Sequence, residues 1–424
     1  MKIPKNILLI TFYWPPAGGA GVYRWLRFSK YFKKNGCNLT VYCPENANWP
    51  IIDNELTEQI PKEIKVIRRK IFEPHKYLNK KNSKGIGFSQ SKKAGVIQTL
   101  IIWIRGNLFI PDARMFWIKP STKFLSKYLK NHPEINTIIS TGPPHSTHLI
   151  ARNLKRKFGL KWLADFRDPW TQIDFYEDLL PSKYANTKQK KLEKMCLIEA
   201  DEVITVSESC GVGLEKISSR KIHIITNGYD FPTFDSSEIK LDKDFTIVHF
   251  GSMPFARNPK VLWDALSELI EEEDKFASKL KINLIGTTDY QVIDSIKKAG
   301  LKPYLSLIST IKHSESLKMQ RKSQLLLLSV NNTGNIKGII TGKFFEYLGA
   351  KRPIIVIGKE GSDLEKIFKT TQAGHFSDFQ DKESTKKYIL NSFHLYQQNK
   401  LFNTAINIEK FHSESLAKNF IKLI

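Results

Sequence analysis

The sequence predicts an α/β protein built from two doubly wound αβα domains that face each other across a cleft. The chain has 424 residues, enough for two domains of ordinary size. Short β-rich runs alternate with amphipathic segments of helical period, the pattern of parallel sheets covered by helices on both faces. The alternation lapses once, at residues 227–244, where turn-forming and charged residues have the composition of a linker.

The first domain is expected over residues 1–228. Its predicted strands are short runs rich in Ile, Leu and Val, as in parallel sheets buried on both faces. They cover residues 7–11, 39–43, 65–69, 137–141, 161–165, 202–206 and 223–226. Helices are predicted between them, most clearly over residues 21–34, 146–158 and 182–200.

The second domain is expected over residues 229–410, where the same rhythm restarts. Its predicted strands cover residues 245–250, 281–285, 305–308, 325–330 and 353–357, with helices such as 260–272 and 343–351. The amphipathic end, about 411–424, is expected to form a helix that packs back on the first domain. Ligands of open α/β sheets bind at the carboxyl ends of the strands, so the functional residues are sought there.

Composition indicates a folded, water-soluble chain of a reducing compartment. Hydrophobic residues make up 41% and charged residues 25%, close to the average of globular proteins. No apolar stretch approaches the roughly 20 residues that span a bilayer, and the N-terminal segment lacks the features of a signal peptide. The four cysteines form no Cys-x-x-Cys pair, so we expect free thiols and no metal site. We therefore expect a cytoplasmic protein.

The net charge of +24 is concentrated in one basic segment, residues 61–130, which holds 17 basic and three acidic residues. Apolar and aromatic side chains lie among these charges, as in the run IQTLIIWI over residues 97–104. This mixture suits an anionic membrane surface, and we predict peripheral association with the inner membrane. The alternative is a solvated basic face over ordinary core helices. Nucleic acid is not an expected partner because no recognition motif accompanies the charge.

A glycine-rich loop follows the first predicted strand and precedes a helix. It contains Gly18 and Gly19 in the run PPAGGAG. Glycines let the backbone turn sharply and approach a ligand, and the helix N-terminus favours a phosphate or sugar oxygen. The alternative is a tight structural corner. The loop matches neither the dinucleotide-binding nor the P-loop pattern.

Polar residues gather after two neighbouring predicted strands in the middle of the chain. Thr141 ends one strand, and His145 lies at the start of the following helix. Asp165, Arg167 and Asp168 follow the next strand in the run DFRDPW. Charges at the mouth of a sheet suit a substrate site, and we predict this role for Asp165 above all. For Arg167 and Asp168, an internal ion pair that fixes a loop is an equal alternative.

Two motifs of the second half combine cations with glycines. Gly342 and Lys343 begin a predicted helix, and Glu346 lies on the same face as Lys343. An ammonium near free backbone N–H groups suits a diphosphate, while a carboxylate suits the two hydroxyls of a ribose. The alternative is an exposed ion pair of about 0.2–0.5 kcal/mol.

The other motif follows the first strand of the second domain. Gly251 permits close approach of a ligand, Ser252 follows it, and Arg257 can reach back over a bound diphosphate. Without a metal, such cations must balance the charge of the leaving group.

Together these motifs resemble the retaining GT-B glycosyltransferases of family 4 (group 1), especially the bacterial members that build surface polysaccharides. The resemblance rests on PPAGG at residues 15–19, DFRDPW at 165–170, Gly-Ser at 251–252 with the following Arg257, and GKFFEYL at 342–348. It spans residues 15–353, and the segment IPDARMFW at 110–117 is similar to the same subgroup.

The resemblance implies two Rossmann-like domains and a transfer that retains the anomeric configuration without a metal or cofactor. The implied donor is a nucleotide-diphosphate sugar, most readily a UDP-sugar, and the implied acceptor is lipid-linked or a polysaccharide. The resemblance also implies that domain closure excludes water and that the sugar is displaced from its front face, since no covalent nucleophile is evident.

The resemblance also implies roles for individual residues. Asp165, Arg257 and Lys343 would be catalytic, with Asp165 beside the transferred sugar and the two cations on the departing diphosphate. The other substrate contacts would come from Gly18, Gly19, Thr141, His145, Arg167, Asp168, Gly251, Ser252, Gly342 and Glu346. Many members carry a further glutamate eight positions before the equivalent of Glu346, but Gly338 stands there in this chain. The identity of the donor sugar is therefore open.

Two other functions fit parts of the pattern. A sugar-nucleotide epimerase of the same fold would need paired acid and base carboxylates and no lipid-facing patch. A noncatalytic sugar-nucleotide-binding subunit of a transferase complex would accommodate Gly338 without loss.

Overall fold

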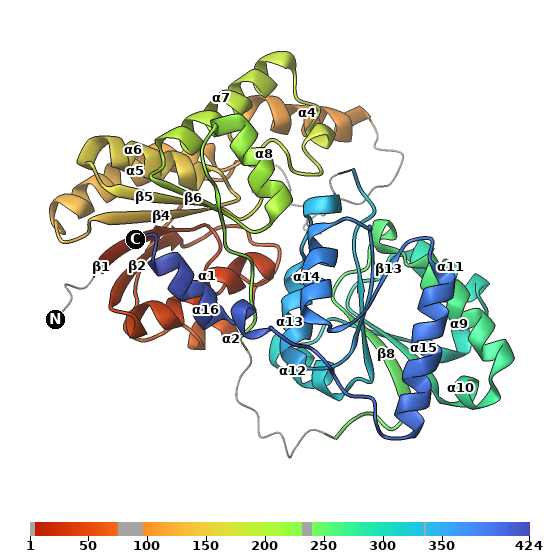
Figure 1. The fold of residues 1–424 in the computed structure, drawn as a ribbon. Helices are drawn as coiled ribbons and strands as arrows, with labels where there is room; N and C mark the ends of the chain where they lie inside the picture. The colour runs from red at the N-terminus through yellow and green to blue at the C-terminus, as the bar shows by residue number, and fades with distance from the viewer. Residues whose placement is uncertain (1–4, 75–95, 231–239, 335) are drawn as a thin grey trace. The chain divides into compact units, whose positions relative to one another are not determined.

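The computed structural model describes residues 5–74, 96–230, 240–334 and 336–424, which divide into two compact units (Figure 1). Unit 1 comprises residues 1–226 together with Ser413–Ile424, and unit 2 comprises Asn227–His412. Each unit is a parallel β-sheet with helices on both faces. Part of the expected linker, residues 231–239, lies outside the described residues.

The sheet of unit 1 has seven parallel strands in the order β3-β2-β1-β4-β5-β6-β7. The strands are β1 (Lys5–Ile10), β2 (Cys37–Pro44), β3 (Lys65–Arg69), β4 (Thr137–Gly142), β5 (Lys161–Phe166), β6 (Glu202–Thr205) and β7 (His223–Ile224). The central strand β1 pairs on one side with β2 and on the other with β4. From β1 the chain first adds β2 and β3 on one side, and it then crosses to β4 on the other side of β1. The carboxyl ends of β1 and β4 therefore border the crevice where α/β sheets bind ligands.

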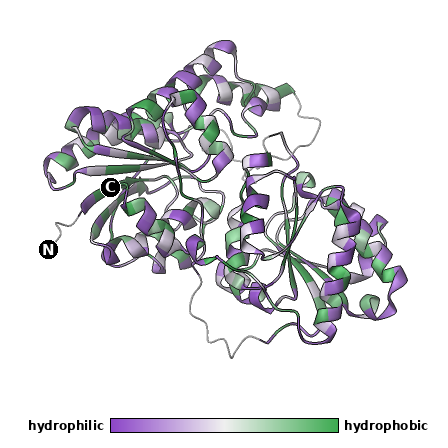
Figure 2. Cartoon of the chain, in the orientation of Figure 1, coloured by the Kyte–Doolittle hydropathy of each residue, from purple (hydrophilic) through white to green (hydrophobic). Residues whose placement is uncertain are grey.

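Eight helices belong to unit 1 within the described ranges. They are α1 (Ala20–Lys34), α2 (Glu55–Glu58), α4 (Val96–Leu108), α5 (Met115–Lys130), α6 (Ser146–Phe158), α7 (Lys183–Glu199), α8 (Glu208–Ser218) and α16 (Ser413–Ile421). Figure 2 shows hydrophobic residues concentrated along the strands and on the helix faces that cover them. None of the helices in the described ranges is long and apolar enough to cross a bilayer.

The C-terminal helix α16 completes the core of unit 1. The ring of Phe420 is fully buried and meets the ring of Trp25 in α1 at 5.0 Å between centroids. Burial of a phenylalanine side chain of this kind contributes about 1.5–3 kcal/mol. The two segments that pass between the units also pair with each other, because the N–H of Tyr229 donates to the carbonyl of Phe411 at 3.1 Å.

The sheet of unit 2 has six parallel strands in the order β10-β9-β8-β11-β12-β13. The strands are β8 (Phe245–Phe250), β9 (Leu280–Ile285), β10 (Leu305–Ile308), β11 (Leu325–Ser329), β12 (Ile354–Gly358) and β13 (Gly374–Asp378). Its helices are α9 (Lys260–Glu272), α10 (Asp274–Lys279), α11 (Tyr290–Lys298), α12 (His313–Lys322), α13 (Gly342–Ala350), α14 (Asp363–Thr371) and α15 (Lys382–Gln397). The order reverses between β8 and β11, which places the ligand-binding crevice of unit 2 at their carboxyl ends.

The predicted fold class is confirmed, and each predicted strand is present. The edge strand β13 was not predicted from the sequence. Its short run GHFSD is mostly polar and only partly buried, because it pairs with β12 alone, so it lacks the apolar run that marks the central strands.

Candidate functional site

The glycine-rich loop of unit 1 is shaped mainly by its own packing. A Cβ atom on Gly18 would lie 2.8 Å from Cγ2 of Ile51, and the Gly18 N–H donates to the Ile51 carbonyl at 2.9 Å. Gly19 has φ +87° and precedes the first residue of α1, where no side chain caps the helix and no acidic residue lies in the first turn. Gly18 is therefore required by packing, and the uncapped N-terminus of α1 is the part of the loop that suits an anion.

Asp165 is completely buried at the end of β5, and its carboxylate is held from within unit 1. It forms an ion pair of 2.9 Å with Arg24 and accepts hydrogen bonds from Trp25 at 2.8 Å and Thr141 at 2.9 Å. With these donors around it, the carboxylate is paired within unit 1 and is not exposed to solvent. In this structure Asp165 and Thr141 together link β4 and β5 to α1, so the substrate role expected for them stays a prediction.

Arg167 and Asp168 form the internal pair that was one of the two alternatives. Their side chains are 3.1 Å apart, and the Arg167 guanidinium also donates to the Gly21 carbonyl at 3.1 Å. Arg167 is mostly buried while Asp168 is about two-fifths exposed. The pair ties the loop after β5 to the start of α1, and of the two only Asp168 leaves much of its side chain at the surface.

His145 and His148 lie together at the start of α6, and both are buried. Ser140 accepts a hydrogen bond from Trp162 at 2.8 Å, and its hydroxyl also shares a hydrogen bond of 2.8 Å with Nδ1 of His148. Burial lowers the pKa of His148 to about 3 and the pKa of His145 well below its ordinary value. Both rings are accordingly neutral at pH 7.

Two buried ring nitrogens of this pair have no hydrogen-bond partner among the described residues: Nδ1 of His145 and Nε2 of His148. Gly142 lies beside both, because a Cβ there would come within 2.6 Å of Nε2 and 3.1 Å of Nδ1. The His145 ring stacks on Trp170, with centroids 4.5 Å apart and planes 3° from parallel. The imidazole of His145 is thus fixed in place as a neutral polar group.

His145 lines a pocket of about 230 Å³ within unit 1, together with Tyr13, Arg105, Pro143, Trp170 and Tyr176. One wall is the segment IPDAR, whose role the sequence did not reveal. Asp112 in that segment accepts hydrogen bonds from the backbone N–H and the hydroxyl of Ser146, each at 2.8 Å. It caps α6 and so anchors the wall beside His145.

The cationic site of unit 2 lies at the carboxyl end of β8. Gly251 has φ +89°, and Lys343 crosses it so closely that a Cβ on Gly251 would lie 2.8 Å from Nζ. Arg257 bends back and donates to the Ser252 carbonyl at 3.1 Å. Burial and then the charge of Arg257 lower the pKa of Lys343 to about 7. Two cations are therefore brought together where a bound anion would relieve their repulsion.

Helix α13 carries the other predicted residues of this site. Gly342 is its first residue, and no side chain caps the N-terminus. Glu346 lies 3.2 Å from Nε2 of His313, the first residue of α12, an interaction that sequence separation had hidden. Gly338, which stands where the resemblance expects a glutamate, lies in the short helical turn Ile336–Gly338. The structure thus brings Gly251, Ser252, Arg257, Gly342, Lys343 and Glu346 to one edge of unit 2.

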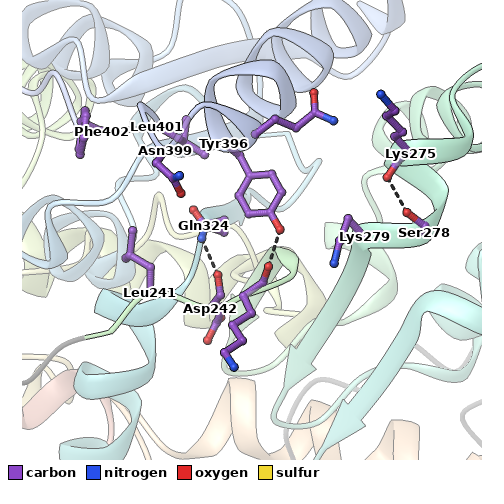
Figure 3. Close-up of a pocket in the computed structure, with 12 residues that line it drawn as sticks. Leu241, Asp242, Lys275, Ser278, Lys279, Gln324, Tyr396, Asn399, Leu401 and Phe402 are labelled. Carbon is purple, nitrogen blue, oxygen red and sulfur yellow. Dashed lines mark hydrogen bonds between the residues drawn. The ribbon is translucent and has the colours of Figure 1, made fainter.

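A second pocket, of about 690 Å³, lies in unit 2 at the amino ends of the strands (Figure 3). Its lining includes Asp242, Lys279 and Gln324, which precede β8, β9 and β11. Two of its walls are joined by the Gln324 side chain, which donates to the Asp242 carbonyl at 2.7 Å. The amino ends of parallel strands are not where α/β sheets bind nucleotides, so this pocket is separate from the cationic site.

The comparisons with known proteins support the fold. No protein-family model matches the sequence, and no curated protein matches it. The structure is similar to sucrose-phosphate synthase from Thermosynechococcus elongatus, with TM-score 0.60 and 14% identity over 99% of this chain and 98% of that chain. It is similar to an S. aureus TarM variant in complex with fondaparinux, α-GlcNAc-glycerol and UDP, with TM-score 0.59 and 11% identity over 99% of both chains.

A putative UDP-N-acetylglucosamine 2-epimerase from Listeria monocytogenes is also similar, with TM-score 0.54 and 10% identity over 99% of this chain and 95% of that chain. These likenesses extend over nearly the whole chain, including both parallel sheets, and identities this low carry the architecture and not the activity. The chain therefore has the GT-B fold.

Proposed function

We propose that the protein is a glycosyltransferase that moves a sugar from a nucleotide-diphosphate sugar to a lipid-linked or polysaccharide acceptor. The observation that carries this proposal is the cationic site of unit 2, where Lys343 crosses Gly251 beside Arg257. A site that holds two cations close together suits a ligand with two adjacent negative charges, such as a diphosphate.

The chemistry assigned to this site is stabilisation of the leaving group. As the bond between the sugar and the diphosphate breaks, negative charge grows on the diphosphate oxygens. Lys343, Arg257 and the uncapped N-terminus of α13 balance that charge without any reorganisation. Glu346 is close to the same helix terminus and suits the ribose hydroxyls. A UDP-sugar is the donor class we favour, since the similar TarM structure contains UDP.

The pocket beside His145 is assigned to sugar hydroxyls. A neutral imidazole that faces a pocket can accept one hydroxyl hydrogen bond, and the stacked Trp170 offers an apolar face to a sugar ring. Retention, which the family resemblance implies, would proceed here by displacement from the front face, because no residue that lines this pocket is arranged as an activated nucleophile. Asp165 contributes indirectly, by holding β4 and β5 on α1.

A test is incubation of the purified protein with UDP-, GDP- and TDP-sugars, each with and without lipid or glycan acceptor. Transfer that depends on Lys343 supports the proposal. The epimerase alternative is favoured by the similarity to the Listeria protein and predicts an isomerised donor without acceptor. Binding of every donor without turnover would replace the proposal with a noncatalytic binding subunit.

A further inference from the structure

We propose that unit 1 docks on an anionic lipid bilayer through a surface formed by α4, α5 and the phenylalanines between them. We call this the α4–α5 surface. It comprises the exposed apolar residues Phe72, Val96, Ile97, Leu100, Ile101, Trp103, Leu108 and Phe116 and the exposed lysines Lys119, Lys123, Lys127 and Lys130. The inference goes beyond glycosyl transfer, because it concerns where the protein acts and needs no turnover.

Helix α4 exposes its apolar side chains in a way that a core helix does not. Val96 is 88% exposed, Ile97 76% and Leu100 55%, and these positions continue as one stripe through Ile101 and Leu108. Green, hydrophobic residues are accordingly visible on α4 in Figure 2. Contiguous apolar patches of this kind mark interaction sites on folded proteins.

Helix α5 supplies the charge. Its four lysines recur at spacings of four, four and three residues, so they lie on one face, and the helix contains no acidic residue. Lys65 and Arg69 of β3 add two cations on the adjoining face of α5, where they lie over the rings of Tyr128 and Phe124 at 5.0 and 4.5 Å.

The apolar and basic parts meet at Phe116. This ring is 44% exposed, and it lies three positions before Lys119 on the same face of α5. It contacts Phe72 at 5.7 Å and Phe109, directly after α4, at 6.2 Å. An apolar helix is thereby joined to a row of cations, the arrangement of elements that lie in a membrane interface.

The positive charge of the α4–α5 surface decides between two partners, a second copy of this chain and an anionic bilayer. A second copy of this chain would bring two lysine rows together within a protein of net charge +24, which is unfavourable. An anionic bilayer satisfies both parts at once, since its phosphates pair with the lysines while α4 enters the boundary of the acyl chains. Six lysines of the basic segment, between residues 75 and 95, lie outside the described residues and carry no part of this argument.

The test is co-sedimentation of the full chain with vesicles of phosphatidylcholine, alone and mixed with increasing shares of phosphatidylglycerol. We expect binding that rises with the anionic share and weakens with salt. A first variant, Ile97→Ser with Leu100→Ser and Ile101→Ser, removes the apolar stripe. A second, Lys119→Glu with Lys123→Glu and Lys127→Glu, reverses the basic row. Each should weaken vesicle binding at least tenfold.

A matched control is Lys275→Glu with Lys279→Glu and Lys281→Glu, which changes the net charge equally on exposed positions of unit 2 and should leave vesicle binding unchanged. Far-UV circular dichroism and thermal unfolding establish that each variant is folded. The absence of wild-type binding, or unchanged binding by either surface variant, overturns the proposal. So does a wild-type dimer in light scattering that the α4 variant dissociates. None of these results bears on donor binding, so a failed docking surface and a failed enzymatic function remain distinguishable.

Discussion

The two sheets have the same type of topology, but the charged groups at the carboxyl ends of their strands are arranged differently. At the edge of unit 1, the carboxylate of Asp165 is paired with Arg24, Trp25 and Thr141, and the two histidines are neutral. At the edge of unit 2, burial and then the neighbouring charge of Arg257 lower the pKa of Lys343 to about 7. One edge has its buried charges paired internally, whereas the other holds two cations, Lys343 and Arg257, close together. Only the second kind of edge gains from an anionic ligand.

The largest expected effect concerns Asp165, at the carboxyl ends of the strands of unit 1. Asp165→Asn leaves the Arg24 guanidinium buried without its counter-charge, and loss of one partner of a buried pair costs about 3–5 kcal/mol. We expect a corresponding fall in the free energy of unfolding measured with urea. Asp168→Asn at the half-exposed neighbouring pair is the control and should cost less than about 1 kcal/mol. Equal losses of unfolding free energy in the two variants would contradict the difference described between the two units.

The next largest effect concerns the cationic site of unit 2. Lys343→Ala should weaken UDP binding about a hundredfold, or about 2.7 kcal/mol, because removal of one cation leaves the diphosphate charge only partly balanced. Titration calorimetry with UDP measures it. Lys351→Ala, an exposed lysine just after the same helix, should bind UDP normally. If Lys343→Ala bound UDP as tightly as the wild type, the diphosphate site would have to lie elsewhere.

A smaller effect tests the histidine pair. Gly142→Ala introduces a Cβ within 2.6 Å of Nε2 of His148, so the rings must shift, and overpacking of this kind costs about 1–3 kcal/mol. We expect lower kcat with UDP binding retained, since the change is confined to unit 1. Gly334→Ala meets nothing within 4 Å and serves as the comparison for added bulk. A normal kcat in folded Gly142→Ala would separate His145 from turnover.

The last prediction concerns a pH dependence, which is small over any single pH unit. The pKa of Lys343 is about 7, far below its ordinary value, so the free protein loses this charge as pH rises through 7. A bound diphosphate favours the protonated amine, and UDP binding should therefore weaken by up to tenfold per pH unit between about pH 7 and 9. Binding should also take up a proton, seen as a dependence of the calorimetric enthalpy on the buffer.

Stability should respond in the opposite direction. Because the unfolded chain holds this proton up to about pH 10.5, the folded protein gains stability as pH rises from about 7 toward that value. Lys343→Arg retains its charge and should bind UDP with no such pH dependence. A wild-type affinity that stays flat over this range would show that Lys343 keeps its proton, and the contrast between the edges would then rest on geometry alone.

The sequence was sufficient for the parallel sheets, because strands buried on both faces are continuous apolar runs such as FTIVHF in β8. It also brought Lys343, Arg257 and Gly251 to one edge, since the carboxyl ends of β8 and β11 must be neighbours in this topology. It did not reveal the partner of Asp165, because Arg24 lies 141 residues earlier and has no signature in the DFRDPW motif. The contacts of Glu346 with His313 and of Asp112 with α6 were missed for the same reason: they depend on packing between distant segments.

The position of α16 has a consequence for the order of folding during synthesis. A ribosome makes the chain from its N-terminus, so every strand of unit 1 has emerged long before Phe420. Until then the aromatic cluster around Trp25 lacks its last ring and stays open to water. Unit 1 is thus translated first but completes its core last. A nascent chain stalled anywhere in unit 2 would expose apolar side chains of unit 1 to chaperones.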